Sequence, residues 1–294
     1  MTRGKIIRLL GGFYTVDSEI GLVETHAKGN FRHFGQKPLV GDWVDFTIEE
    51  KEGVQVLGYI ESIEERTNTL LRPPVANVDQ VILCVPVKDP AYNLQLVDSI
   101  LVHYEMENLP IVILITKADL DPSKAKELAE IYQLAGYTSK MVNLKSQGIK
   151  EALLPLLRGK TSVLAGVSGA GKSTLTSLCL GRKLQTGSVS EKTRRGKHTT
   201  RHVEIYPGDG FYLLDTPGFS RMDLDDCKPE DLADYFPEMK KQVGPCKFKD
   251  CSHISEPQCA VKKKLQEGLI AKSRYENYAS FYQELKEREK NKWH

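Results

Sequence analysis

The sequence lacks any segment of uninterrupted apolar residues long enough to cross a membrane. Its first residues, MTRGKIIRLLGGFYTV, also lack the long apolar core and the small-residue cleavage site of a secretory signal. Excess charge is nearly absent, because 41 basic residues face 39 acidic ones, so a nucleic-acid surface would have to come from local clusters. These absences argue against a membrane-spanning or polybasic protein and predict a cytoplasmic one.

Cysteine is also scarce, with six residues in 294. Three of the six lie close together, at positions 246, 251 and 259, and without an export signal such a group favours a metal over disulfides. The composition itself, 40% hydrophobic and 27% charged, is that of a globular protein with length for two or three domains. Basic residues gather between 182 and 201, where seven Lys or Arg accompany one acid, and within residues 1–40, where six face three acids.

Residues 1–67 are predicted to form a small β-barrel of the OB-fold or SH3-like kind. Five runs of strand-forming residues are separated by turn signals, and these runs are KIIRLL, FYTV, GLVETH, DWVDFTI and VQVLGYIESI. A β-extension that only packs on its neighbour would give the same pattern, because a fold alone does not fix a function.

Residues 68–228 alternate between strand and helix patterns, which is typical of an α/β domain with a parallel sheet and helices on both faces. The predicted strands are DQVILCVP, PIVILI, SKMV, SVLAG, HVEIY and GFYLLD, and helices are predicted over 93–105, from Ser123, over 148–157 and from Lys172. Residues 229–294 hold the cysteine group and a charged helix over 273–291. The helix carries an aromatic stripe that favours a face docked on its own domain over an RNA platform, and the stripe comprises Tyr275, Tyr278, Phe281, Tyr282 and Leu285.

The segment GVSGAGKST is the most specific motif in the sequence and indicates a phosphate-binding loop. It follows a predicted strand and opens a helix, as a GxxxxGKS phosphate loop does. Backbone N–H groups of such a loop surround phosphates, Lys172 reaches the β and γ phosphates, and Ser173 ligates Mg²⁺. A chance glycine-rich turn would not explain the flanking strand and helix. The predicted phosphate-contacting residues are Gly166, Val167, Ser168, Gly169, Ala170, Gly171, Lys172, Ser173 and Thr174.

Two further segments favour a GTPase over an ATPase or a kinase. In LLDTPG, Asp215 ends a predicted buried strand and would hold Mg²⁺ through water, while the Gly218 N–H would sense the γ-phosphate. In ITKAD, close to the NKxD guanine motif, the Asp119 carboxylate can accept hydrogen bonds from guanine N1 and N2, and the Lys117 stem packs along the base. DTPG could instead be a plain turn, and TKAD a coincidence.

The TKAD segment, Thr116, Lys117, Ala118 and Asp119, departs from the consensus in one residue and in its place. Thr116 replaces asparagine, and a threonine is shorter, which weakens the bracing expected of the base loop. TKAD also precedes the phosphate loop by about 50 residues, whereas the base loop ordinarily comes last. The order therefore predicts a circularly permuted GTPase domain, with residues 143–145 as its second base-contacting loop.

Together with LLRPPVANVDQV, RGKHTT and the cysteine group, these motifs make the whole chain similar to the ribosome small subunit-dependent GTPase A (RsgA) family. The resemblance implies an OB-like barrel at 1–67, a permuted P-loop GTPase domain at 68–228 and a zinc-binding helical domain at 229–294. It also implies hydrolysis of GTP to GDP with Mg²⁺ during late maturation of the small (30S) ribosomal subunit. The partners it implies are that subunit and its 16S rRNA. The protein would be a monomer that leaves the subunit after hydrolysis and binds no membrane.

The resemblance assigns RRGKHTTR, residues 194–201, to switch I. Thr200 would contact Mg²⁺ in the GTP state. No glutamine follows DTPG to orient the attacking water, and His198 is the catalytic candidate that the family implies. Otherwise His198 would be one more polar residue in a basic loop.

The cysteine group extends to CKFKDCSHISEPQC, in which Cys246, Cys251, His253 and Cys259 offer three thiolates and one imidazole. This is a closed tetrahedral Zn²⁺ set with a structural role, and unpaired cytosolic thiols are the alternative. Because Cys246 follows Gly218 by only 28 residues, γ-phosphate contacts at Gly218 are expected to bias the pose of the zinc segment directly.

Residues 26–37, HAKGNFRHFGQK, interleave basic and aromatic side chains as an RNA-binding loop does, although a solvated loop with buried phenylalanine has the same composition. Two other functions stay open on the residues alone. One is a P-loop switch that acts on a protein target, with the barrel as a protein-binding module. The other is a non-enzymatic RNA-binding protein in which the nucleotide is structural.

Overall fold

The computed structural model describes residues 1–28, 37–49, 57–71, 73–183, 203–216, 218–219, 221–240 and 246–291. His198, Thr200 and most of the loop at 26–37 lie outside the described residues. The chain divides into two compact units built from interleaved segments. The first unit comprises residues 1–80, 150–164 and 173–217, and the second comprises 81–149, 165–172 and 218–294.

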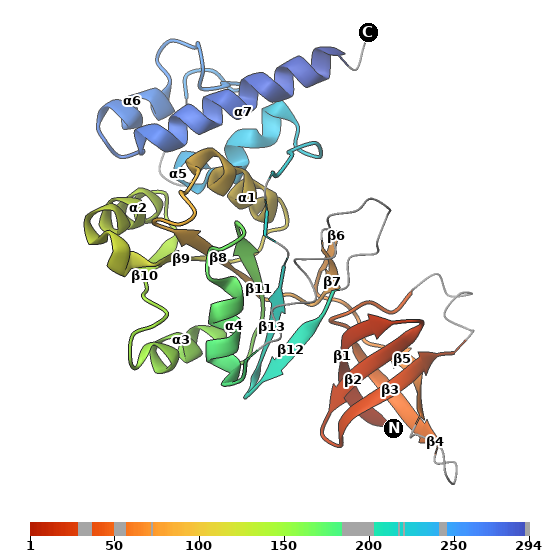
Figure 1. The fold of residues 1–294 in the computed structure, drawn as a ribbon. Helices are drawn as coiled ribbons and strands as arrows, with labels where there is room; N and C mark the ends of the chain where they lie inside the picture. The colour runs from red at the N-terminus through yellow and green to blue at the C-terminus, as the bar shows by residue number, and fades with distance from the viewer. Residues whose placement is uncertain are drawn as a thin grey trace. The chain divides into compact units, whose positions relative to one another are not determined.

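The N-terminal part is a closed barrel of five strands in the order β1-β2-β3-β5-β4, with β4 pairing back onto β1 (Figure 1). Its strands are β1 (Thr2–Leu10), β2 (Phe13–Ser18), β3 (Gly21–Ala27), β4 (Trp43–Glu49) and β5 (Leu57–Ile63). The period of two along a strand sorts the side chains, so Val44 and Phe46 of β4 are fully buried while Asp45 between them is not. The predicted five-stranded barrel is confirmed.

The central sheet has six strands in the order β10-β9-β8-β11-β13-β12. They are β8 (Gln80–Pro86), β9 (Ile111–Thr116), β10 (Thr138–Met141), β11 (Thr161–Gly166), β12 (Ile205–Gly208) and β13 (Phe211–Asp215). Every residue of β8 and β11 is buried, which explains why both read as continuous apolar runs. The strand expected at 202–206 lies further along because β12 forms an antiparallel hairpin with β13, in which Tyr206 pairs with Leu213.

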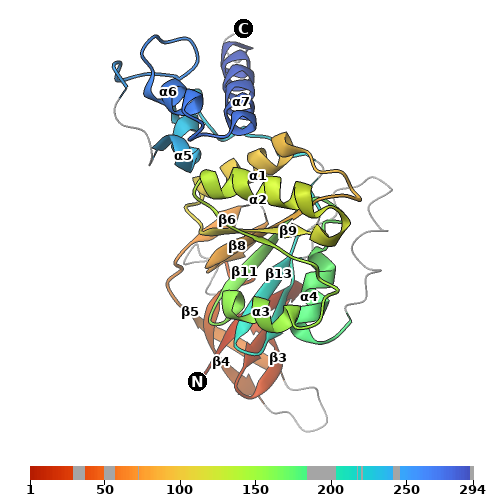
Figure 2. The ribbon, with the colours of Figure 1, turned by 90° about the vertical axis from the view of Figure 1, so that its left-hand side faces the viewer.

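A separate two-stranded sheet of β6 (Thr69–Leu71) and β7 (Pro74–Ala76) follows the barrel. Among its described residues, the α/β region contains the α-helices α1 (Leu94–Met106), α2 (Pro122–Leu134), α3 (Ile149–Leu157) and α4 (Lys172–Leu180). Side-chain caps start two of them: Asn93 accepts from two N–H groups of α1, and Asp121 accepts from the Lys124 N–H of α2. Figure 2 shows α3 and α4 in front of β11 and β13.

The C-terminal part is helical, with the 3₁₀ helix η4 (Pro229–Tyr235) and the helices α5 (Pro237–Lys240), α6 (Ala260–Gln266) and α7 (Lys272–Asn291). Tyr278, Phe281 and Leu285 of α7 are buried in a core that also includes Val102 of α1. The aromatic stripe therefore packs inside the protein, as predicted. Among the described residues, no helix combines the length and the apolar character needed to cross a bilayer.

Candidate functional site

The phosphate loop connects β11 to α4, whose first residue is Lys172. A side chain at Gly166 is excluded, because φ is +136° and a Cβ there would lie 2.4 Å from the Cys84 carbonyl oxygen. Lys172 is buried, and its ammonium donates to the carbonyl oxygens of Gly166 and Val167, both at 2.9 Å. The loop thus has the tight backbone and the buried cation that phosphate binding requires.

Ser173 and Asp215 meet at the start of α4. The Ser173 hydroxyl donates to Oδ2 of Asp215 at 3.0 Å. A hydroxyl and a carboxylate are oxygen ligands of the kind that Mg²⁺ prefers, so this donor set fits the ion expected here.

Gly218 of DTPG lies against the phosphate loop. A Cβ on Gly218 would stand 2.4 Å from the backbone nitrogen of Ser168, so no larger residue fits. The neighbouring Phe219 N–H donates to the Gly166 carbonyl at 3.1 Å. The structure therefore brings these two motifs into backbone contact, although about 50 residues separate them in the chain.

The TKAD loop is joined to the phosphate loop by Thr116. This residue is fully buried at the end of β9, and its Oγ1 donates to the carbonyl oxygen of Ala170 at 2.7 Å. Thr116, although shorter than the asparagine of the consensus, thus braces the TKAD loop through its hydroxyl. Lys117 adopts the left-handed conformation with φ of 56°, and Asp119 is exposed.

Residues 143–145, predicted to be a second base-contacting loop, lie beside both other loops. The Ala118 N–H donates to the Val142 carbonyl at 3.3 Å. A Cβ on Gly171 would lie 3.1 Å from a methyl carbon of Leu144. Asn143 closes the turn by accepting from the Lys145 N–H at 2.9 Å. The second loop is thus adjacent to TKAD and to the phosphate loop.

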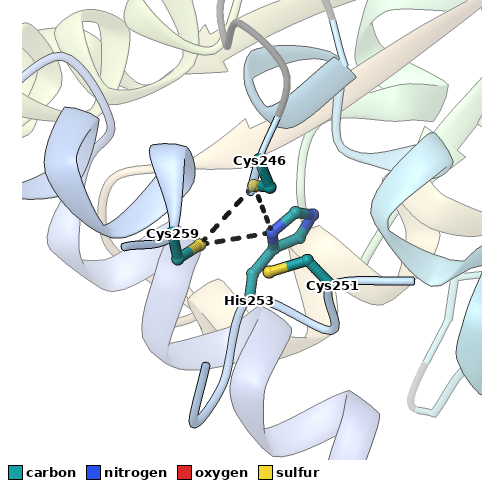
Figure 3. A group of neighbouring side chains, drawn as sticks. All are labelled: Cys246, Cys251, His253 and Cys259. Carbon is teal, nitrogen blue, oxygen red and sulfur yellow. Dashed lines mark hydrogen bonds between the residues drawn. The ribbon is translucent and has the colours of Figure 1, made fainter. Parts of the chain in front are cut away.

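The predicted metal ligands Cys246, Cys251, His253 and Cys259 converge, with all four ligand atoms within 4.8 Å of one another (Figure 3). Nδ1 of His253 lies 3.6 Å from the sulfur of Cys246 and 3.4 Å from that of Cys259, and these two sulfurs are 3.9 Å apart. Around tetrahedral zinc, bond lengths of about 2.3 Å to sulfur and about 2.0 Å to nitrogen give edges of roughly 3.5 to 3.8 Å. None of the six cysteines, all of which lie in the described parts of the chain, forms a disulfide, and the geometry of the Cys/His set fits Zn²⁺.

Comparison with known proteins agrees with this geometry. The protein-family model of the RsgA GTPase matches residues 63–225 of this chain, and the family model of the RsgA N-terminal domain matches residues 3–56. The chain belongs to the RsgA GTPase family. The motif resemblance is thereby confirmed.

Curated relatives of this RsgA chain match it over nearly its whole length. The small ribosomal subunit biogenesis GTPase RsgA 1 of Listeria monocytogenes is 45% identical over 98% of this chain and 99% of its own. The small ribosomal subunit biogenesis GTPase RsgA of Halalkalibacterium halodurans is 41% identical over 100% of both chains.

Two solved structures share the fold. YjeQ from Thermotoga maritima has a TM-score of 0.80 and 37% identity over 97% of this chain and 98% of its own. YloQ, titled a circularly permuted GTPase, has a TM-score of 0.78 and 35% identity over 98% and 96%. The predicted permuted GTPase fold of the RsgA family is therefore confirmed, while the roles of individual residues stay predictions.

The electrostatics of this RsgA chain suit a metal at the Cys/His set. Burial lowers the pKa of His253, which favours the neutral ring that binds a metal. Burial, followed by the neighbouring thiols, raises the pKa of Cys251 to about 12. Three thiolates this close would repel one another, and a bound dication offsets that cost.

Sequence reasoning missed Glu256, which shapes the loop that carries the ligands. Its carboxylate accepts from the Ser252 N–H at 2.7 Å, from the Ser252 hydroxyl at 2.6 Å and from the Ile254 N–H at 3.1 Å. His253 lies between those two residues with φ of 62°, so Glu256 stabilises the turn that presents the imidazole. An acid within a short ligand loop was the available signal.

Proposed function

We propose that this protein is a GTPase that binds the small (30S) ribosomal subunit, assists its late maturation and leaves after GTP hydrolysis. The observation that supports the proposal most strongly is the Thr116–Ala170 hydrogen bond, because it attaches the TKAD loop, the proposed reader of guanine, to the phosphate loop. Relatives at 41% to 45% identity carry the name small ribosomal subunit biogenesis GTPase, which supports the assignment of the partner.

Each motif has a proposed part. Asp119 accepts from the guanine edge, and Lys117 covers the base. Lys172 and the loop N–H groups hold the phosphates, and Mg²⁺ held near Ser173 and Asp215 neutralises phosphate charge. His198 and Thr200 are proposed to orient water and to contact Mg²⁺; both lie outside the described residues.

The other parts are proposed to contact the ribosome. We propose three domains, at 1–67, 68–228 and 229–294. The barrel and the C-terminal domain would bind 16S rRNA, and the central domain would time release from the subunit through GTP hydrolysis. Zn²⁺ bound by the Cys/His set would be structural, since the set leaves no open position. We further propose a cytoplasmic monomer.

The decisive experiment is the nucleotide dependence of binding to purified 30S subunits, measured by co-sedimentation. Tight binding with a non-hydrolysable GTP analogue, release with GDP, and hydrolysis stimulated by the subunits would support the proposal. Stimulation by a protein partner without RNA would instead support a switch acting on a protein target. Binding to the subunits without any nucleotide dependence would favour an RNA-binding protein in which the nucleotide is structural.

A further inference from the structure

A buried cluster of charges joins the C-terminal helices to α1. Arg274 of α7 donates to Asp98 of α1 at 2.7 Å and to Glu238 of α5 at 2.8 Å, and all three side chains are about 1% exposed. Asn277, also on α7, donates to the second oxygen of Asp98 at 2.6 Å. Buried charges are costly unless they are paired in good geometry, so this cluster defines one position of α7 against α1.

The segment that leads into α1 touches both loops of the candidate nucleotide site. The Lys117 ammonium of TKAD donates to the Asp89 carbonyl oxygen. A Cβ on Gly169 of the phosphate loop would lie 3.2 Å from Pro90. Asn93, only three residues after Pro90, caps α1. A nucleotide that orders these two loops must therefore act on residues 89–93 and on the start of α1.

The other end of the connection is the Cys/His segment. Tyr275, the residue after Arg274, donates its hydroxyl to the His253 carbonyl at 2.8 Å. Tyr278 donates to the Ser252 carbonyl at 2.7 Å, one turn further along α7. Any displacement of α7 is thus transferred to the backbone that carries a metal ligand.

We propose that Asp98 and Arg274 form the joint through which nucleotide binding orders the Cys/His segment. Nucleotide steadies residues 89–93, α1 holds Arg274 through Asp98, and the two tyrosines of α7 hold the loop around His253. The inference rests on the proposed binding of guanine nucleotide. It adds a path of side-chain contacts to the direct connection expected from Gly218 to Cys246, and such a path needs a measured coupling.

The direct connection has its own ion pairs, which supply a matched control. Arg288, on the same helix, pairs with Asp223 and Asp225, which follow Gly218 in the chain, and with Glu284 within α7, and its side chain is 31% exposed. Exposed pairs contribute little to stability. Arg288→Gln therefore removes a cation from α7 without touching the buried joint, and it weakens the path through residues 221–225 instead.

The test is amide hydrogen exchange of the full, metal-loaded chain with and without saturating GDP. In the parent protein, GDP should slow exchange in residues 246–259 by about fivefold, the lower end of usual coupling factors. Asp98→Asn should abolish that response while GDP affinity changes less than about twofold. In this variant the buried Arg274 cation is still neutralised by the Glu238 carboxylate, so the helices should stay folded. Tyr275→Phe should keep the response in α7 and lose it around His253.

Three results would overturn the joint. These are an unchanged exchange of residues 246–259 when the parent binds GDP, a full response in Asp98→Asn, and loss of the response in Arg288→Gln alone. Failure of the parent to bind GDP, seen in the same titration, would overturn the proposed function and the joint together. If the parent binds GDP but exchange in residues 246–259 is not slowed, only the joint is overturned.

Discussion

The hydrogen bond from Thr116 to Ala170 can be removed with almost no change of shape. Valine has the outline of threonine with a methyl group in place of the hydroxyl. Thr116 is fully buried, as is Ala170, so no bulk water reaches this bond. In Thr116→Val the Ala170 carbonyl loses this donor, and the TKAD loop loses its side-chain attachment to the phosphate loop.

The size of the effect follows from the burial of the bond. A neutral hydrogen bond contributes about 0.5 to 1.5 kcal/mol net, and a buried acceptor left without a donor costs about 1 to 3 kcal/mol. Part of this loss falls on folding and part on holding the base loop in its binding position. We expect about 0.7 to 1.4 kcal/mol to appear in binding, which is a threefold to tenfold rise in the Kd for GDP.

The assay is titration with a fluorescent GDP analogue, accompanied by steady-state GTP hydrolysis. Thr116→Val should raise Kd and KM together and leave kcat unchanged, because the bond positions the base loop and touches no reacting atom. Thr116→Ser keeps the hydroxyl and should stay within about twofold of the parent. Parent-like affinity in Thr116→Val, or an equal loss in Thr116→Ser, would refute the reasoning.

Four more outcomes are expected. Asp119→Asn should shift preference from GTP towards xanthosine triphosphate in competition binding, and an unchanged preference would show that TKAD does not read the base. His198→Ala should slow subunit-stimulated hydrolysis by at least about 100-fold with GTP affinity kept; unchanged turnover would refute the assignment. Freshly purified protein should contain about one zinc, and Cys251→Ser should lose it by elemental analysis with a lowered Tm. Burial lowers the pKa of Lys5 from 10.5 to about 8, so the unfolded chain holds more protons between those values. The free energy of unfolding of the parent relative to Lys5→Met should then rise by about 2 kcal/mol from pH 7 to pH 9.5 in denaturant titrations, and a flat difference would contradict it.

The sequence by itself determined the parts whose chemistry is local. The phosphate loop, DTPG and the CKFKDCSHISEPQC group work through residues a few positions apart, so their spacing carries the information. Strand and helix periods also predicted the barrel and the α/β region, because one face of each element has to be buried. One exception is β12, a strand at the edge of the sheet whose register is set by its hairpin partner β13.

Only the tertiary structure decided how those parts are joined. The hydroxyl of Thr116 meets a carbonyl 54 residues away, the ammonium of Lys5 meets Thr161 across 156 residues, and Asp98 meets Arg274 across 176. Nothing in the local pattern marks these partners, since a buried polar residue and an exposed one look alike in sequence. Their pairing follows from which elements pack together, because a buried polar group must be satisfied by whatever the packing brings within reach.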